Sequence, residues 1–141
     1  MDHLQTIRNK VEVAVPGATF GPPLQSEVIE VVERDLGHTI PLPLKEVYLA
    51  CDGFTGPTYA PFLMRLADAA QSTLQQRTER LESWAHDFLL YGTNGLCGYL
   101  LLSIDGTHTV KLWHPGDEEL EGLGSIWDAW RFIGRPFGLT H

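Results

Sequence analysis

The sequence predicts an α+β fold in which an antiparallel sheet meander packs with helices from the N-terminal and C-terminal parts of the chain. Helical apolar spacing dominates up to about residue 86, short apolar runs bounded by Gly and Asn follow, and no βαβ alternation appears. The chain has 141 residues, of which 43% are hydrophobic and 20% charged. We therefore expect a single domain over residues 1–141, with its core at about 3–133 and a loose tail over 134–141.

The first expected helix covers residues 3–14, where one side is apolar and carries Leu4, Ile7, Val11 and Ala14. Residues 10–15 also fit an alternating strand. Pro16-Gly17 ends the element in either case, and a connecting loop follows it.

Two further helices are expected between Val28 and Gly53. The first ends at Gly37, because glycine adopts the left-handed C-terminal conformation without steric strain. The second begins at Pro43, which suits the first helical position, and ends at Asp52-Gly53. The apolar face of the first helix holds Val28, Ile29, Val31, Val32 and Leu36, and that of the second holds Leu44, Val47, Tyr48 and Cys51.

The middle of the chain predicts an irregular surface loop over residues 53–61, a short strand over 62–64 and the longest helix over 67–86. The expected inward residues of this helix are Ala70, Leu74, Leu81 and Trp84. The expected outward residues are Gln75, Arg77, Glu79, Arg80 and Glu82.

The last part predicts the meander, with strands over residues 88–91, 98–104 and 107–113. Asp105-Gly106 between the second and third runs indicates a hairpin turn whose two central residues have positive φ. An acidic loop then leads to a final helix over 126–133, for which Ser125 and Asp128 fit a capping box. Its residues Ile126, Trp127, Trp130 and Ile133 are expected to reach the sheet.

The two helices between Val28 and Gly53 resemble the opening of the SMI1/KNR4 domain, also called the SUKH superfamily. That opening is typically a helix with "I..vE..LG", then "LP", then a helix with a hydrophobic and aromatic run, then "nG" or "DG". The matching positions here are Ile29, Glu33, Leu36-Gly37, Ile40-Pro41, Val47, Tyr48-Leu49 and Asp52-Gly53, with Ile40 where the family more often has Leu. The later order of strands, acidic loop and helix also fits, so the resemblance covers roughly residues 3–133 and is weakest over 55–85. It implies an SMI1/KNR4-like single domain.

Side chains that carry chemistry are sparse. The six histidines form no HExxH or comparable ligand pattern, so we expect no metal site and no cofactor. Cys51 and Cys97 lack CxxC spacing and are expected to be free thiols, with one disulfide as the alternative. Residues 122–125 before the last helix could offer N–H groups to a phosphate, but they lack the lysine of a phosphate loop, and a flexible loop with an N-cap is the simpler interpretation.

Glu33 is the one acid that the resemblance includes. A carboxylate near the end of a helix opposes the helix dipole, so we expect Arg34, Lys45 or a backbone N–H of the next helix to compensate it. No second acid supports a general acid and base pair, and we predict that the protein is not an enzyme.

Charge favours a cationic partner. The formal net charge is −8 and the pI about 5.1, which argues against nucleic-acid binding because phosphate neutralisation needs a basic face. Four acids fall within five positions of the expected loop: Asp117, Glu118, Glu119 and Glu121. They could steer a basic protein into contact, with Trp113 as an aromatic anchor. The alternative is a solvated loop that keeps the protein soluble.

The resemblance implies a protein-binding function, because many SUKH-like proteins are immunity proteins that bind and block a bacterial toxin domain, often a nuclease. An acidic inhibitor suits a basic nuclease cleft. A regulatory or scaffold domain and a small-ligand binder or enzyme, using residues 52–59 and the sheet face, are the alternatives. We expect a cytoplasmic protein without a membrane segment or secretory signal, either monomeric or a weak homodimer.

Overall fold

The computed structural model describes residues 3–56, 59–79, 84–117 and 119–134, and it confirms the α+β class. The helices are α1 (His3–Ala14), α2 (Ser26–Leu36), α3 (Leu42–Ala50), α4 (Leu66–Glu79) and α5 (Ile126–Gly134), with a 3-10 helix η1 (Ala85–Asp87). The strands are β1 (Thr19–Phe20), β2 (Phe54–Thr55), β3 (Phe88–Thr93), β4 (Tyr99–Ser103), β5 (Val110–Trp113) and β6 (Glu121–Gly124). The predicted meander is present as an antiparallel sheet in the order β3-β4-β5-β6, and β1 pairs with β2 in a separate antiparallel ribbon.

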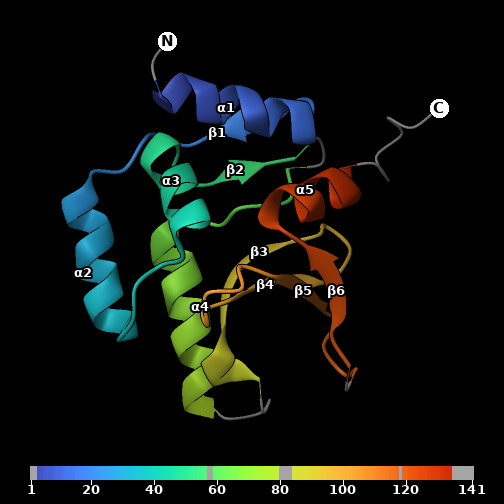
Figure 1. Ribbon diagram of the computed structural model, residues 1–141. Helices are drawn as coiled ribbons and strands as arrows, with labels where there is room; N and C mark the ends of the chain where they lie inside the picture. The colour runs from blue at the N-terminus through green and yellow to red at the C-terminus, as the bar shows by residue number, and fades with distance from the viewer. Residues whose placement is uncertain (1–2, 57–58, 80–83, 118, 135–141) are drawn as a thin grey trace.

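Figure 1 shows how these parts are arranged. Helix α1 lies at one end beside the β1–β2 ribbon, α2, α3 and α4 lie along one side, and α5 lies between the ribbon and the sheet. The main core forms where these elements meet, around the fully buried Trp130 of α5. The Trp130 ring packs at a centroid distance of 4.8 Å from Phe54 of β2 and 6.1 Å from Tyr91 of β3. One helix therefore joins the ribbon to the sheet through aromatic contacts.

The first three helices follow the predicted signals. Ile7, Val11 and Ala14 are buried on α1, which excludes the alternative strand over residues 10–15. Gly37 ends α2 with a φ of 83° and donates its N–H to Glu33 O, as the C-cap signal predicts. The four residues expected on the apolar face of α3 are buried.

The apolar face predicted for α2 is too wide. Ile29 and Leu36 are buried, but Val28 is 46% exposed and Val31 is 51% exposed. The reason is that α2 lies at the periphery of the molecule and packs mainly against α4, so only one narrow side of it is covered (Figure 1).

Helix α4 ends earlier than predicted and buries a charge that was expected to face solvent. It covers residues 66–79, and the predicted Leu81, Arg80 and Glu82 positions lie outside the described residues. The Arg77 guanidinium is partly buried and donates to the carbonyl oxygens of Ala85 and Phe88. Burial lowers the pKa of Arg77 from its usual value. Arg77 therefore ties α4 to η1 and to the start of β3.

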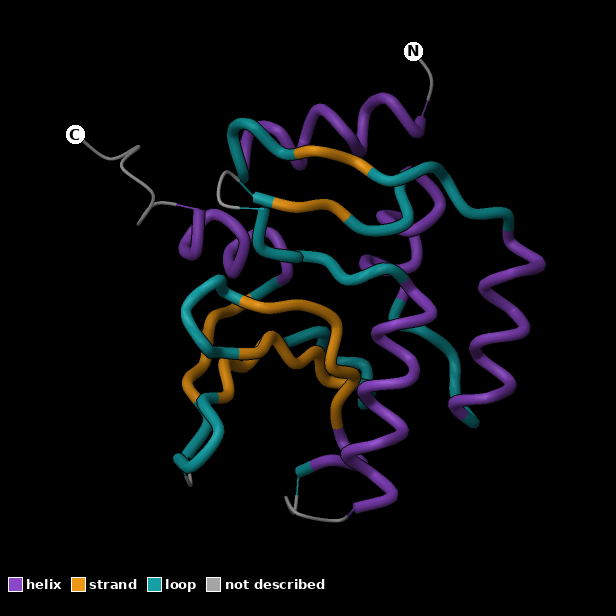
Figure 2. The backbone as a smooth tube through the Cα atoms, turned by 180° about the vertical axis from the view of Figure 1, so that it is seen from behind, coloured by secondary structure: helices purple, strands orange, loops and turns teal. Residues whose placement is uncertain are grey.

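A short segment, residues 61–64, joins the ribbon to the sheet. Leu63 exchanges two backbone hydrogen bonds with Phe54 of β2, at 3.0 and 3.2 Å. On the other side, Met64 N–H donates to Tyr91 O at 2.8 Å and Thr93 N–H donates to Pro61 O at 3.0 Å. The expected strand over 62–64 is thus a single bridge with β2, and the expected surface loop over 53–61 is wrong at Phe54, which is only 2% exposed. Figure 2 shows the segment 61–64 running between β2 and the nearest strand of the sheet.

Helix α4 covers the rest of the outer edge of β3. The Thr73 hydroxyl donates to Leu90 O at 3.3 Å and accepts from Leu90 N–H at 3.0 Å. With the Arg77 bond to Phe88 O and the bonds from segment 61–64, these contacts bind outward backbone groups at Phe88, Leu90, Tyr91 and Thr93. This edge of the sheet is protected against pairing with another chain.

The β4–β5 connection lies where Asp105-Gly106 predicted it but is longer than a two-residue turn. Gly106 has a φ of 95°, whereas Asp105 is not among the residues with positive φ, and β5 begins only at Val110. His108, with a φ of 56°, lies in this connection, so the strand predicted over 107–113 begins three residues later than expected. The Asp105 carboxylate organises the turn by accepting hydrogen bonds from the Ser103 hydroxyl and from the Thr107 N–H and hydroxyl.

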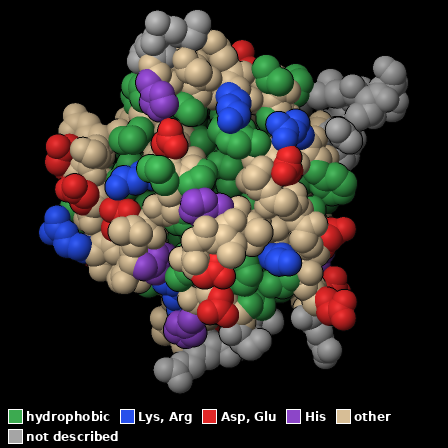
Figure 3. Space-filling view, viewed as in Figure 1, with side chains coloured by type: hydrophobic (Ala, Val, Ile, Leu, Met, Phe, Trp, Pro, Cys, Tyr) green, Lys and Arg blue, Asp and Glu red, His purple; other side chains and the backbone are tan. Residues whose placement is uncertain are grey.

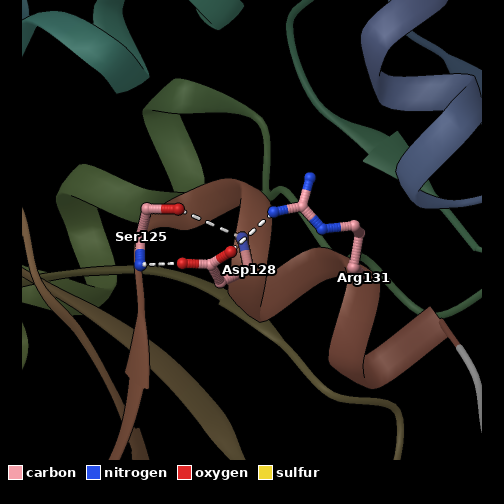
Figure 4. A network of polar contacts seen from close by, with 3 residues as sticks. All are labelled: Ser125, Asp128 and Arg131. Carbon is pink, nitrogen blue, oxygen red and sulfur yellow. Dashed lines mark hydrogen bonds and ion pairs between the residues drawn. The ribbon is translucent and has the colours of Figure 1, made fainter.

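The acidic loop ends in a fourth strand that the sequence did not predict. Residues 121–124 pair with β5 as β6, with a bulge opposite Val110 and a φ of 87° at Gly124. The predicted capping box is confirmed directly after it (Figure 4). Asp128 N–H donates to the Ser125 hydroxyl at 3.1 Å, and Ser125 N–H donates to the Asp128 carboxylate at 3.2 Å. The Ser125 N–H and the Arg131 guanidinium lower the pKa of Asp128.

We predict that Gly92→Ala destabilises the fold by about 1–3 kcal/mol, the usual range for overpacking. A Cβ at Gly92 would lie 2.1 Å from the Phe62 carbonyl oxygen, inside the segment that joins the ribbon to the sheet. The matched control is Gly122→Ala, where the nearest atom to a new Cβ is Lys111 Nζ at 3.5 Å. Urea denaturation of both variants measures the difference, and equal midpoints would show that the segment can move aside.

A second prediction concerns Asp105. Hydrogen bonds from the Ser103 hydroxyl, the Thr107 hydroxyl and the Thr107 N–H lower the pKa of Asp105 to about 2. Because the folded-state pKa is below the unfolded one, the stabilisation is present above about pH 4 and is lost as the pH falls toward 2. A carboxyl-carbon NMR titration should give a pKa near 2, and Asp105→Asn should flatten the dependence of unfolding free energy on pH in this window. A measured Asp105 pKa at the ordinary value of an aspartate would contradict the hydrogen bonds described for this turn.

Candidate functional site

The face of the sheet that points away from α5 carries a second, smaller hydrophobic cluster. Its buried members are Leu90, Leu101 and Trp113. Four aromatic rings belong to this face, and we call them the aromatic cluster: Trp84, Phe88, Tyr99 and the buried Trp113. The Trp113 ring is central, with its centroid 4.9 Å from that of Trp84 and 5.4 Å from that of Tyr99. The other three rings are only partly buried, so this face offers aromatic surface to a partner.

Trp113, the predicted aromatic anchor, is only 6% exposed. Its ring is covered by its neighbours, and it offers a partner little area of its own. We infer that Trp113 supports the start of the acidic loop, while the partly exposed Trp84, Phe88 and Tyr99 provide the accessible aromatic surface.

The acidic loop, residues 114–120 between β5 and β6, is held at several points. Leu120 packs against the aromatic cluster, and β6 begins directly after it. The side chains of Asp117, Glu119 and Glu121 are exposed, whereas Glu118 lies outside the described residues. Figure 3 shows acidic side chains at the edge of the molecule formed by β6, with a separate acidic group over α2. The predicted acids are therefore presented from an anchored loop.

These carboxylates have few cationic neighbours. Asp117 lies 4.0 Å from His114 Nδ1, and its side chain is 67% exposed. Within the described part of the chain, no ion pair involves Glu119 or Glu121. Such charges keep their electrostatic field available for an approaching cation.

Two buried polar atoms lie beside the acidic loop without a hydrogen-bond partner among the described residues. They are Trp113 Nε1 and Gln76 Oε1. Both residues line a hollow of about 340 Å³ between α4 and the sheet, together with Ser72, Gln75, Leu90, Tyr99 and Pro115. The sequence did not single out Gln76, although Thr73, Gln76 and Arg77 form a polar stripe at helical spacing that marks the side of α4 facing β3.

A larger open groove of about 800 Å³ lies where the small-ligand alternative was placed. It is bounded by the β1–β2 ribbon, residues 61–65 and the first turns of α4. Phe20, Phe54 and Leu63 contribute apolar wall, and Asp52 and Arg65 contribute charge. The Asp52 carboxylate accepts the Leu66 N–H at 2.8 Å and thereby caps α4, so it serves a structural role.

The acid singled out by the resemblance, Glu33, is also structural. Its carboxylate accepts the Ile40 N–H at 2.7 Å and lies 3.7 Å from Lys45 Nζ. Of the expected compensating groups Lys45 is present, and the N–H comes from Ile40, two residues before α3, and not from the helix itself. The Tyr48 hydroxyl likewise donates to Met64 O at 2.8 Å, and burial raises the Tyr48 pKa well above its usual value.

The described residues contain no group of three His, Cys, Asp or Glu side chains placed to hold a metal ion. The two free thiols are confirmed, with Cys51 buried and Cys97 exposed. Among the helices described here, none has the length and apolar character that a bilayer crossing requires.

No family model matches the chain, and no curated protein matches it.

We predict that one thiol per chain reacts with a disulfide reagent such as Ellman's in the native state and that the second reacts only after unfolding. Burial raises the pKa of Cys51 to about 12, with the Arg8 charge opposing and the Asp52 charge adding to the shift. The variant Cys97→Ser should abolish the native reaction and Cys51→Ala should preserve it. Equal native rates for the two thiols would contradict the burial of Cys51.

Proposed function

We propose that this chain is a protein-binding domain of the SMI1/KNR4 type, and that it acts as an immunity protein that binds and neutralises a basic toxin domain, for example a nuclease. The observation that carries the proposal is the acidic loop, whose Asp117 and Glu119 carboxylates are exposed while its Leu120 packs against the aromatic cluster. An anchored loop loses little conformational entropy on binding, so more of the electrostatic attraction contributes to affinity. The net charge of −8 supports the same type of partner.

A nuclease that binds the phosphate backbone needs a basic cleft, and an acidic surface can occupy that cleft in place of the substrate. Asp117, Glu119 and Glu121 would supply the charge, together with Glu118 of the same loop. Trp84, Phe88 and Tyr99 would supply the apolar contacts next to it. Inhibition then requires occupation of the cleft and no chemistry by this chain.

The test begins with a pull-down from the native cell extract at low and high salt, with mass spectrometry of the retained proteins. A basic toxin retained at low salt is then purified and its affinity measured by calorimetry. Its enzymatic activity in the presence of the purified chain decides between neutralisation and simple binding. Retention of a housekeeping protein in place of a toxin would favour the regulatory or scaffold alternative.

Charge reversal of the acidic loop and the first residue of β6, with Asp117, Glu118, Glu119 and Glu121 all changed to Lys, should weaken toxin binding by about tenfold or more, with the larger effect at low salt. The matched control reverses four exposed acids elsewhere, Glu12, Glu27, Glu30 and Asp35, so that the net charge changes equally. Equal weakening in both variants would assign the effect to net charge and discard the loop as the contact surface. Unchanged binding of the toxin by the loop variant would support the protein-binding function but show that the loop is not the contact surface.

A small-ligand function is a second candidate, favoured by the groove of about 800 Å³ with its apolar wall. Native mass spectrometry of the purified protein tests it, because a metabolite that copurifies would add its mass to the chain. Displacement of that mass by the bulky variant Ser72→Trp, at the rim of the groove, would assign the ligand to this place.

A further inference from the structure

The two edges of the sheet differ in what covers them. The outer edge of β3 is bonded to α4 and to segment 61–64. In contrast, β6 ends the strand order, and no described strand pairs with its outer side. Three of its four residues are exposed, namely Glu121, Gly122 and Gly124. This strand is the open edge of the sheet within the described residues.

The register identifies which backbone groups face outward. Ser103 N–H donates to Thr109 O, and the alternation of an antiparallel ladder then directs the backbone groups of Leu112 toward β6. Glu121 stands opposite Leu112, so its own backbone groups point toward β5. Those of the next residue, Gly122, therefore point to the open edge. The same alternation places Leu90 N–H and C=O on the outer side of β3, where Thr73 binds them.

A small hollow lies beside this edge. It has a volume of about 350 Å³ and is lined by Glu121, Gly122, Leu123, Asp128, Arg131 and Phe132. The Phe132 side chain is 51% exposed, although it is large and apolar. Figure 4 shows Asp128 and Arg131 side by side on α5, close to the end of β6. The hollow thus combines an aromatic wall with the Glu121 carboxylate and the Asp128–Arg131 ion pair.

We propose that β6 binds an extended, cationic segment of the partner protein by strand addition. This inference rests on the proposed function and names how the partner docks. The Gly122 N–H and C=O would bond the backbone of the added strand, and alternate side chains of that strand would enter the hollow. A lysine or arginine fits there, with its aliphatic stem on Phe132 and its charge near Glu121. The next cationic side chains along the strand would reach Glu119 and Asp117.

Net charge and Glu121 favour this occupant over a second copy of the chain, while Lys111 Nζ and Arg131 are the cations that also lie at this edge. Two copies paired through β6 would each bring a net charge of −8 and an exposed Glu121 to one interface. Like charges placed opposite one another across a ladder are destabilising. A cationic strand reverses the sign of this interaction.

The test uses the capped peptide Thr-Lys-Val-Lys-Val-Lys-Thr as the probe, titrated into isotope-labelled protein and followed by NMR. Two variants are compared with the wild type. Gly122→Pro removes the outward N–H at an edge position where proline is tolerated, and Gly122→Ala keeps it with only Lys111 Nζ nearby. Thermal unfolding first establishes that all three proteins are equally folded.

The expected result is that the wild type and Gly122→Ala bind the peptide and that amide exchange at position 122 slows at least tenfold at saturation. Gly122→Pro should weaken binding by about tenfold, in line with the loss of one backbone hydrogen bond at a protein surface. A peptide N-methylated at alternate residues keeps its charge but cannot donate to the edge, and it should lose binding to the same extent. This peptide keeps the proposal testable if Gly122→Pro does not fold.

Four outcomes would overturn the proposal. The first is that the wild type does not bind the peptide at millimolar concentration, and the second is that the N-methylated peptide binds equally well. The third is that NMR chemical-shift changes are confined to Asp117 and Glu119 while amide exchange at Gly122 is unchanged. The fourth is that the protein forms a dimer that Gly122→Pro dissociates. The third outcome leaves the acidic loop as a cation-binding surface, so strand addition can fail while the proposed function stands. If the pull-down retains no toxin, the proposed function fails, but peptide binding would still show that β6 accepts an added strand.

Discussion

The backbone pairing of residues 61–64 on both of their sides is the constraint on which the rest of the structure depends. One side bonds β2 and the other bonds β3, so a ribbon and a sheet become a continuous surface. The Trp130 indole fixes the same segment from α5 by donating to Phe62 O at 3.1 Å, and Gly92 allows the close approach from β3. The core around Trp130 can form only when these three elements meet.

The elements that the sequence predicted correctly are decided by residues close together in the chain. Gly37 ends α2, and Ser125 with Asp128 begins α5, and each signal lies within a few residues of its effect. The errors arise where the partner is distant in sequence. Asp52 caps α4 from 14 positions upstream, and Arg77 turns inward to reach Phe88 O. Strands of two residues, such as β1 and β2, are too short to show any periodicity.

The sequence predicted which charged residues of the candidate site are exposed, but it did not predict which of its aromatic residues are buried. Clustered acids on a loop are exposed because burying an unpaired charge is costly, and the structure agrees for Asp117, Glu119 and Glu121. Burial of Trp113 could not be inferred from alternation, since both faces of this sheet are apolar and neither face of β5 is marked as solvent-facing. Strand β6 was missed because a run of Glu, Gly, Leu and Gly has low strand propensity and forms here only against β5.

The position of the acidic residues next to the open edge has a physical rationale. An unpaired strand invites association with any extended chain, and natural proteins discourage this with charge and bulges, both of which are present at β6. A carboxylate at such an edge repels other copies of the same acidic chain and attracts a cationic one. Its field reaches about 8 Å at physiological ionic strength, so it acts on segments already close to the strand. The charge that protects β6 from self-association therefore also selects the class of segment that the edge can accept.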